Sequence, residues 1–184
     1  MSIRAFISVD LARQKEIEDY ITELKQADPT LKVVDPGQIH VTLKFLGETD
    51  EALVPRIAEA MAKAAEGIAP FDVRFKGSDA FPTKNRIRVI WVGMNDALPM
   101  GTMATRLDES ISALGFEREK RPFAPHLTVA RTKVEGSNPA VRQLIENHKD
   151  ADLGSQHIDA IRLKKSVLTR CGPEYTTLEE VRLS

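Results

Sequence analysis

Two short stretches of the sequence pair an imidazole with a hydroxyl at the same spacing. One residue separates His40 from Thr42, and one residue separates His126 from Thr128. The chain holds only 4 His in 184 residues, so chance would rarely produce this pattern twice. An imidazole can give or take a proton at neutral pH, and a threonine hydroxyl can donate a hydrogen bond to an anionic oxygen. Two such pairs suit acid–base chemistry at a phosphate.

The residues between and after these side chains are apolar, as in half-buried β-strands. Residues two apart in a strand point to the same face, so each strand presents its His and Thr together. If the two pairs face each other across a cleft, they can carry out an in-line displacement at phosphorus. One imidazole deprotonates the attacking oxygen and the other protonates the leaving oxygen, while the hydroxyls hold the non-bridging oxygens.

Lys44 is predicted to continue the first set on the face of His40 and Thr42, where its ammonium can neutralise phosphate charge. The matching position of the second strand is Ala130, so the two copies differ there. Arg131 is expected on the opposite face, unless a bulge or the end of the strand turns it round.

A structural interpretation competes with each of these assignments. A single His beside a Thr is usually a satisfied structural pair, whereas two matched pairs favour catalysis. Neither motif His has a second ligand at zinc spacing, so no metal site is expected. His148 and His157 have no Thr partner and are predicted to be structural. Cys171, before Gly-Pro, lacks a paired His and is predicted to be incidental.

Composition limits the possible classes of function. Lys and Arg total 26 and Asp and Glu total 27, so the chain lacks the basic excess of a protein that binds duplex nucleic acid by counterion release. The sequence contains no dinucleotide or P-loop motif, so no cofactor is expected. We expect a soluble, cytoplasmic monomer with no membrane partner. Two basic clusters occur in the sequence: Lys84, Arg86 and Arg88, and Arg118, Lys120 and Arg121. A solvent-exposed face is the simpler interpretation of each cluster.

Periodicity and turn residues indicate an α+β fold in a single domain of residues 1–184, with a mixed, largely antiparallel sheet and outer helices. Strands are expected over 4–9, 31–34, 39–46, 71–75, 87–92, 125–131, 158–168 and 175–183. Helices are expected over 17–24, from 55 to 65, over 100–114, and from a start at Ser137 to Pro139.

At the two motifs the sequence resembles the two-histidine phosphoesterases, which are defined by two His-x-Thr-x motifs. It is most similar to the RNA 2′,3′-cyclic phosphodiesterases, also called 2′-5′ RNA ligases. The similarity extends over nearly the whole chain and rests on residues 4–7, 40–48, 88–93, 125–131 and 163–178.

The resemblance implies a bilobal fold with pseudo-twofold symmetry and one motif on each side of a central cleft. It implies metal-independent hydrolysis of an RNA 2′,3′-cyclic phosphate to a 2′-phosphate. His40 would protonate the leaving 3′ oxygen and His126 would deprotonate water. In the reverse reaction an RNA 5′-hydroxyl replaces water and makes a 2′-5′ linkage, without ATP.

The sequence leaves the physiological substrate open between RNA ends and small cyclic nucleotides. A non-catalytic module that binds RNA ends or nucleotides is the alternative from another class. Candidate substrate contacts, each of which could equally be a solvated charge or a structural hydroxyl, are Lys44, Arg88, Arg131, Ser166 and Tyr175.

Overall fold

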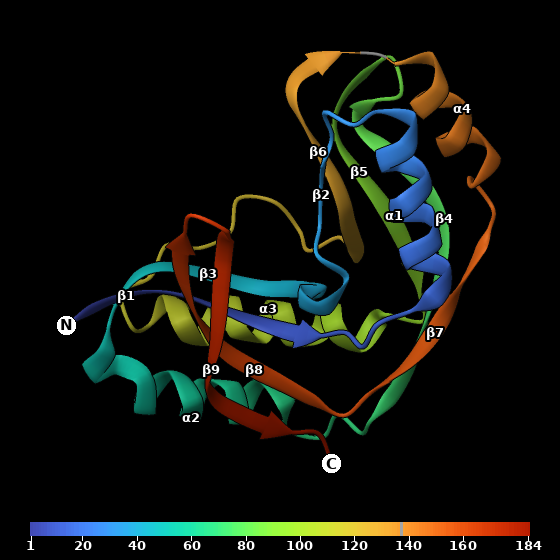
Figure 1. Cartoon of the computed structure of the whole chain (residues 1–184). Helices are drawn as coiled ribbons and strands as arrows, with labels where there is room; N and C mark the ends of the chain where they lie inside the picture. Colours follow the sequence, from blue (N-terminus) through green and yellow to red (C-terminus); the bar gives the residue numbers. More distant parts are fainter. Residues whose placement is uncertain (137) are drawn as a thin grey trace.

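Two antiparallel sheets built from distant parts of the chain form the centre of the molecule (Figure 1). The computed structural model describes residues 1–136 and 138–184. The first sheet has the order β3 (His40–Asp50), β1 (Ser2–Asp10), β8 (Ala160–Thr169) and β9 (Gly172–Arg182). The second has the order β2 (Lys32–Val33), β6 (His126–Gly136), β5 (Arg86–Asn95), β4 (Phe71–Thr83) and β7 (Asp152–Ile158). The chain therefore crosses between the sheets several times, and strands from both of its ends share the first sheet.

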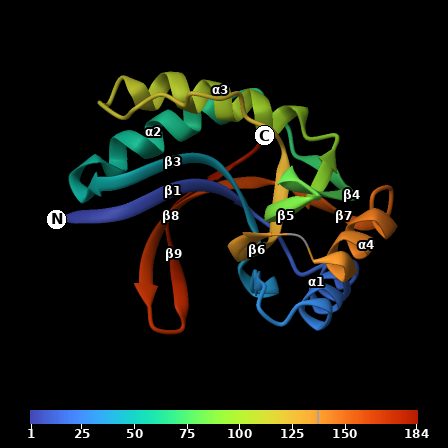
Figure 2. The ribbon, with the colours of Figure 1, turned by 90° about the horizontal axis from the view of Figure 1, so that it is seen from above.

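Four helices cover the outer faces of the sheets (Figure 2). Helices α2 (Val54–Ala65) and α3 (Leu98–Ser112) pack on each other and against the first sheet. Helices α1 (Lys15–Ala27) and α4 (Pro139–Asn147) pack on each other and against the second. Two short 3₁₀ turns, η1 (Pro36–Gln38) and η2 (Glu51–Leu53), flank β3. The face of each sheet that the helices do not cover is available to form a functional site.

Helix α1 illustrates how the apolar pattern of the sequence produces these layers. Its apolar residues recur with helical spacing, so they lie on one side, and Ile17, Tyr20, Ile21 and Leu24 are all buried as predicted. Most of the buried apolar residues of both sheets and all four helices belong to one hydrophobic cluster. This shared core holds the two sheets in place beside each other.

The α+β class is confirmed, and every strand pair in the described part of the chain is antiparallel. The sequence pattern does not predict β7, because only Leu153 and Ile158 of this polar segment are buried. It also ends β3, β4 and β6 too early, because glycines and polar residues continue those strands.

Helix α4 begins at Pro139 as predicted, and the Asn138 side chain caps its first turn. Ser137, which the sequence analysis included in this helix start, lies outside the described residues. Among the helices of the described residues, none is both long and apolar enough to cross a membrane.

Candidate active site

Strand β3 carries the first motif at its start and is bulged directly after it. Neighbouring residues of β1 pair with Thr42 and Lys44, which leaves Leu43 as an extra residue. Leu43 and Lys44 are consequently both buried, and the alternation of faces shifts by one position. Phe45 therefore returns to the cleft with His40 and Thr42.

Strand β6 repeats this irregularity after the second motif. Neighbouring residues of β5 pair with Thr128 and Ala130, so Val129 is the extra residue. Val129 and Ala130 are both buried, and Arg131 emerges into the cleft beside Thr128. Arg131 thus occupies the position in the second motif that Phe45 occupies in the first.

The bulge gives Lys44 a structural position instead of the predicted one. Its Nζ donates to Asp108 Oδ1 (2.9 Å), to the carbonyl of Glu117 (2.7 Å) and to Glu119 Oε1 (3.4 Å). Only 1% of its side chain is exposed, and an ammonium has only three protons to donate. The prediction that Lys44 shares the face of His40 is wrong, and its charge is already neutralised within the protein. Lys44 instead ties β3 to α3 and to the segment that leads into the second motif.

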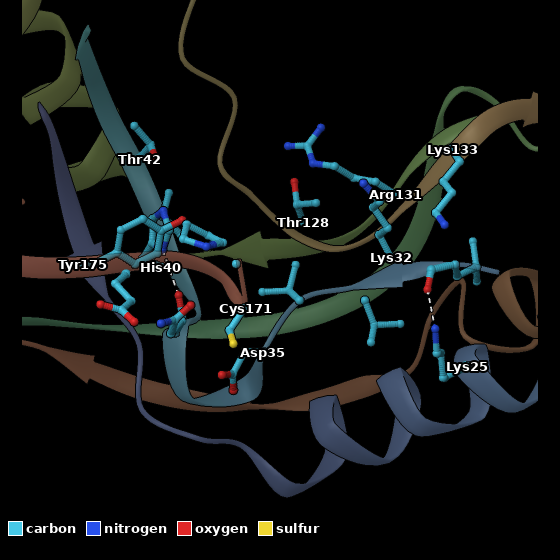
Figure 3. Close-up of a pocket in the computed structure, with 18 of the residues that line it drawn as sticks. Lys25, Lys32, Asp35, His40, Thr42, Thr128, Arg131, Lys133, Cys171 and Tyr175 are labelled. Carbon is cyan, nitrogen blue, oxygen red and sulfur yellow. Dashed lines mark hydrogen bonds between the residues drawn. The ribbon is translucent and has the colours of Figure 1, made fainter. Parts of the chain in front are cut away.

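The two motifs line a common cleft between the sheets. His40, Thr42, His126 and Thr128 all border a cavity of about 1210 Å³ (Figure 3). An adjoining cavity of about 790 Å³ shares Thr42, His126, Thr128 and Arg131 with the first. The two cavities are therefore parts of one cleft that both motifs border, as the family resemblance implies.

Each motif histidine forms a hydrogen bond to the backbone carbonyl two residues before it. The Nδ1 of His40 lies 2.9 Å from the carbonyl of Gln38, and the Nδ1 of His126 lies 2.7 Å from the carbonyl of Ala124. A carbonyl oxygen can only accept, so Nδ1 carries the proton and donates in both rings. This arrangement fixes the tautomer and leaves each Nε2 available for proton transfer.

The two imidazoles differ in their surroundings. His40 lies against Phe6 and Tyr175, with ring centres 5.0 Å and 5.2 Å away. Burial lowers the pKa of His40 below its ordinary value because the charged form loses its hydration. His126 is exposed, and the centres of its ring and the Trp91 ring are 6.2 Å apart. The first motif is therefore the more desolvated of the two.

The hydroxyls of Thr42 and Thr128 have no competing partner in the described part of the chain. Both residues are half-buried at the cleft, and neither Oγ1 forms a hydrogen bond to another described residue. A threonine that served only the local structure would bond its own His or the backbone. Both hydroxyls are instead free to donate to a bound anion.

The structure brings only some of the predicted substrate contacts to the cleft. Arg131 and Tyr175 line the larger cavity, and the buried Lys44 borders only the adjoining one. Arg88 borders none of the described cavities, and its Nε lies 3.6 Å from Glu135. Ser166 pairs with Tyr175 across the strands but also lies outside those cavities.

The remaining histidines lie away from the cleft. His148 stacks on Tyr20 with ring centres 4.2 Å apart, and the Nδ1 of His157 lies 2.8 Å from Asp72. Cys171 is exposed at the border of the larger cavity. Within residues 1–136 and 138–184, no three His, Cys, Asp or Glu side chains are grouped to hold a metal ion.

The sequence analysis did not assign a role to Phe45, Trp91 or Lys32, although all three border the cleft. Phe45 is 68% exposed, which is unusual for so large an apolar side chain. Aligning the two motifs residue by residue would have matched Phe45 with Arg131 and pointed to it. No local signal marks Lys32, because its place depends on a distant strand.

The segment that carries the first motif matches a known family. Residues 9–91 match the LigT like Phosphoesterase family. The chain is 34% identical over 187 residues to an RNA 2′,3′-cyclic phosphodiesterase of Methanothermobacter thermautotrophicus, covering 100% of both chains. It belongs to the LigT-like phosphoesterase family. A relative of the same name from Aeropyrum pernix is 37% identical over 153 residues, which cover 83% of this chain and 86% of the relative.

Solved structures share the fold of this LigT-like phosphoesterase. A Thermus thermophilus protein superposes with a TM-score of 0.77 at 26% identity, covering 98% of this chain and 97% of its own. E. coli LigT complexed with 3′-AMP has a TM-score of 0.77 at 22% identity, covering 100% of this chain and 99% of its own. The two-sheet architecture is therefore that of the family.

Replacing Lys44 with Met should lower stability and leave catalysis per folded molecule nearly unchanged. Removing one partner of a buried ion pair costs roughly 3 kcal/mol or more. In a protein of this size that loss lowers the melting temperature by about 6–12 °C. Thermal melts and steady-state kinetics of this variant, with the exposed Lys63→Met as control, test the assignment. An unchanged melting temperature with a raised KM would return Lys44 to the substrate site.

Proposed function

We propose that this protein hydrolyses the 2′,3′-cyclic phosphate at the end of an RNA to a 2′-phosphate by two-histidine acid–base catalysis. The observation that carries the proposal is the pair of matched histidines, each with a free Nε2, in one cleft. Curated relatives from archaea and bacteria that bear the name RNA 2′,3′-cyclic phosphodiesterase support the choice of substrate.

In this mechanism the two imidazoles act on opposite sides of the phosphorus. Nε2 of His126 takes a proton from water as the water oxygen attacks phosphorus. The bond from phosphorus to the 3′ oxygen breaks, and Nε2 of His40 gives its proton to that oxygen. The product keeps the phosphate on the 2′ oxygen. Exchange with solvent then returns His40 to the protonated form and His126 to the neutral form.

The remaining groups of the cleft stabilise charge on the phosphate. The hydroxyls of Thr42 and Thr128 donate to the two non-bridging oxygens, on which negative charge is concentrated in the transition state. Arg131 supplies a positive charge next to Thr128 and can donate two parallel hydrogen bonds to a phosphate. Tyr175 packs on the edge of His40 and restricts the orientation of that ring.

The same geometry permits the reverse reaction. An RNA 5′-hydroxyl in the position of the attacking water would give a 2′-5′ linkage with no need for ATP. We also propose that no metal ion takes part, since one imidazole takes a proton from water and the other gives a proton to the leaving oxygen. Hydrolysis of a cyclic phosphate substrate in the presence of EDTA tests the independence from metal ions. Tight binding without turnover would favour a non-catalytic module instead.

Replacing either His40 or His126 with Ala should lower turnover by roughly 10²- to 10⁴-fold, which is the usual contribution of a positioned general acid or base. Hydrolysis of 2′,3′-cyclic CMP, measured for both variants in EDTA, tests this expectation. His157→Ala is the matched control, because this exposed imidazole lies outside the described cavities. Near-normal turnover in either motif variant would remove that residue from the mechanism.

Thr42→Val and Thr128→Val should each lower turnover by about 10²-fold, because each deletes a donor aimed at developing charge. Valine keeps the shape and the strand preference, and neither hydroxyl has an intramolecular bond to lose. The melting temperature should therefore stay within about 2 °C of wild type, a shift that corresponds to under 1 kcal/mol. Variants that melt several degrees earlier but retain full turnover per folded molecule would make these threonines structural.

The pH dependence of His126→Ala should reveal the role of His40. If His40 is the acid, its protonated form is needed, so residual kcat/KM falls as pH rises through its pKa. Burial lowers that pKa, so the fall should be centred below the ordinary value of about 6.5. Measuring kcat/KM from pH 4 to 9 tests this. A residual rate that rises with pH would instead make His40 the base.

A further inference from the structure

Three cationic side chains stand beside the proposed catalytic centre at one end of the larger cavity. Lys32 comes from β2, and Arg131 and Lys133 come from β6. All three are exposed and line the cavity. Figure 3 shows them grouped together, with Thr128 between them and His40. We call Lys32, Arg131 and Lys133 the basic edge.

The like charges of the basic edge destabilise the folded protein. Lys32 and Arg131 are direct partners across the β2–β6 pair. Like charges at directly opposite positions of an antiparallel pair repel each other and destabilise the sheet. Within residues 1–136 and 138–184, none of the three cations forms an ion pair with a carboxylate. The acidic residue of the same strand, Glu135, faces Arg86 and Arg88 instead.

Most cations of the two other basic clusters lie within ion-pair distance of a carboxylate. Lys84 pairs with Glu146, and both Arg86 and Arg88 lie within ion-pair distance of Glu135. In the other cluster, Arg118 pairs with Asp108 and Lys120 with Glu117, whereas Arg121 borders the adjoining cavity and has no ion pair within residues 1–136 and 138–184. The basic edge differs in that all three of its cations keep their charge available, and all three line the larger cavity.

The order of the residues along β6 connects the basic edge to the reaction centre. His126, Thr128, Arg131 and Lys133 all face the same cavity, so one strand carries catalytic and cationic side chains in a line. Arg131 and Lys133 are two residues apart, or about 7 Å along a strand. That separation is comparable to the distance between consecutive phosphates of an extended nucleic acid strand.

We propose that Lys32 and Lys133 form a subsite for the phosphodiester backbone of a single-stranded RNA whose cyclic end occupies the catalytic centre. This inference rests on the proposed function and specifies its substrate as an oligoribonucleotide. A cyclic mononucleotide ends before it reaches these lysines and gains nothing from them. An RNA strand places its internal phosphates along the basic edge and gains affinity from the release of its counterions.

The test compares two substrates with one reacting group. These are 2′,3′-cyclic CMP and a six-nucleotide RNA that ends in a 2′,3′-cyclic phosphate. Wild type should show a kcat/KM about tenfold or more higher for the RNA at low salt. Lys32→Gln/Lys133→Gln should remove most of that advantage and change kcat/KM for the mononucleotide by less than about threefold. Glutamine is chosen because a new carboxylate opposite Arg131 would pair with it.

Salt dependence provides a second measurement on the same variants. Each phosphate contact to a single strand contributes about −0.7 to the slope of log affinity against log salt. The double variant should therefore flatten the slope for the RNA by about 1.4. Lys63→Gln/Lys76→Gln is the matched control, because it removes two exposed lysines outside the described cavities. The melting temperature of the basic-edge variant should not fall, since a repulsive pair is relieved.

The outcomes separate the inference from the proposed function. Hydrolysis of both substrates with equal kcat/KM would retain the cyclic phosphodiesterase and overturn the subsite in favour of small cyclic nucleotides. An equal loss on both substrates in the basic-edge variant, or the same loss in the control variant, would also overturn it. If wild type hydrolyses neither substrate, the proposed function fails, and the substrate assignment fails with it.

Discussion

The site depends on one extra residue in each of two strands. A regular strand after the first motif would point Lys44 into the cleft and Phe45 into the core. A bulge reverses this order in both motif strands, so Phe45 and Arg131 reach the cleft while Lys44 and Ala130 are buried. The bulges preserve the pairing of His with Thr and re-aim only the side chains after each Thr. The chemistry available around the phosphate is therefore decided by strand register.

Burial of Lys44 has a structural consequence that reaches the second motif. A buried ammonium needs full compensation, and Lys44 finds it in Asp108, Glu119 and the carbonyl of Glu117. Although burial opposes ionisation of Asp108, hydrogen bonds from Lys44, from the Glu119 amide and from Arg118 lower its pKa to about 2. The partners of Lys44 lie on α3 and on the segment before His126. The ammonium of Lys44 thus connects the strand of the first motif to α3 and to the segment that precedes the second motif.

The matched motifs sit in unlike surroundings, so the two imidazoles are not equivalent. The backbone hydrogen bonds at Nδ1 are equivalent, but His40 is packed between aromatic rings and His126 is exposed. The bulges add a second asymmetry, because they place an apolar ring after one motif and a guanidinium after the other. In the proposed mechanism, Arg131 of β6 meets phosphate charge beside Thr128, and the basic edge continues the same line of side chains.

The sequence by itself determined the α+β class, most of the helices, and the two His–Thr pairs. These features follow from local periodicity. Side chains two residues apart share a face of a strand, and side chains four residues apart share a face of a helix, whatever the rest of the chain does. Tertiary structure alone decided that Lys44 is buried, that Arg131 faces the cleft and that Lys32 lies opposite it. A bulge is defined by the partner strand, and a cross-strand neighbour by a segment far away in the chain. The register between strands is a property of the assembled core, so no local pattern in the sequence contains it.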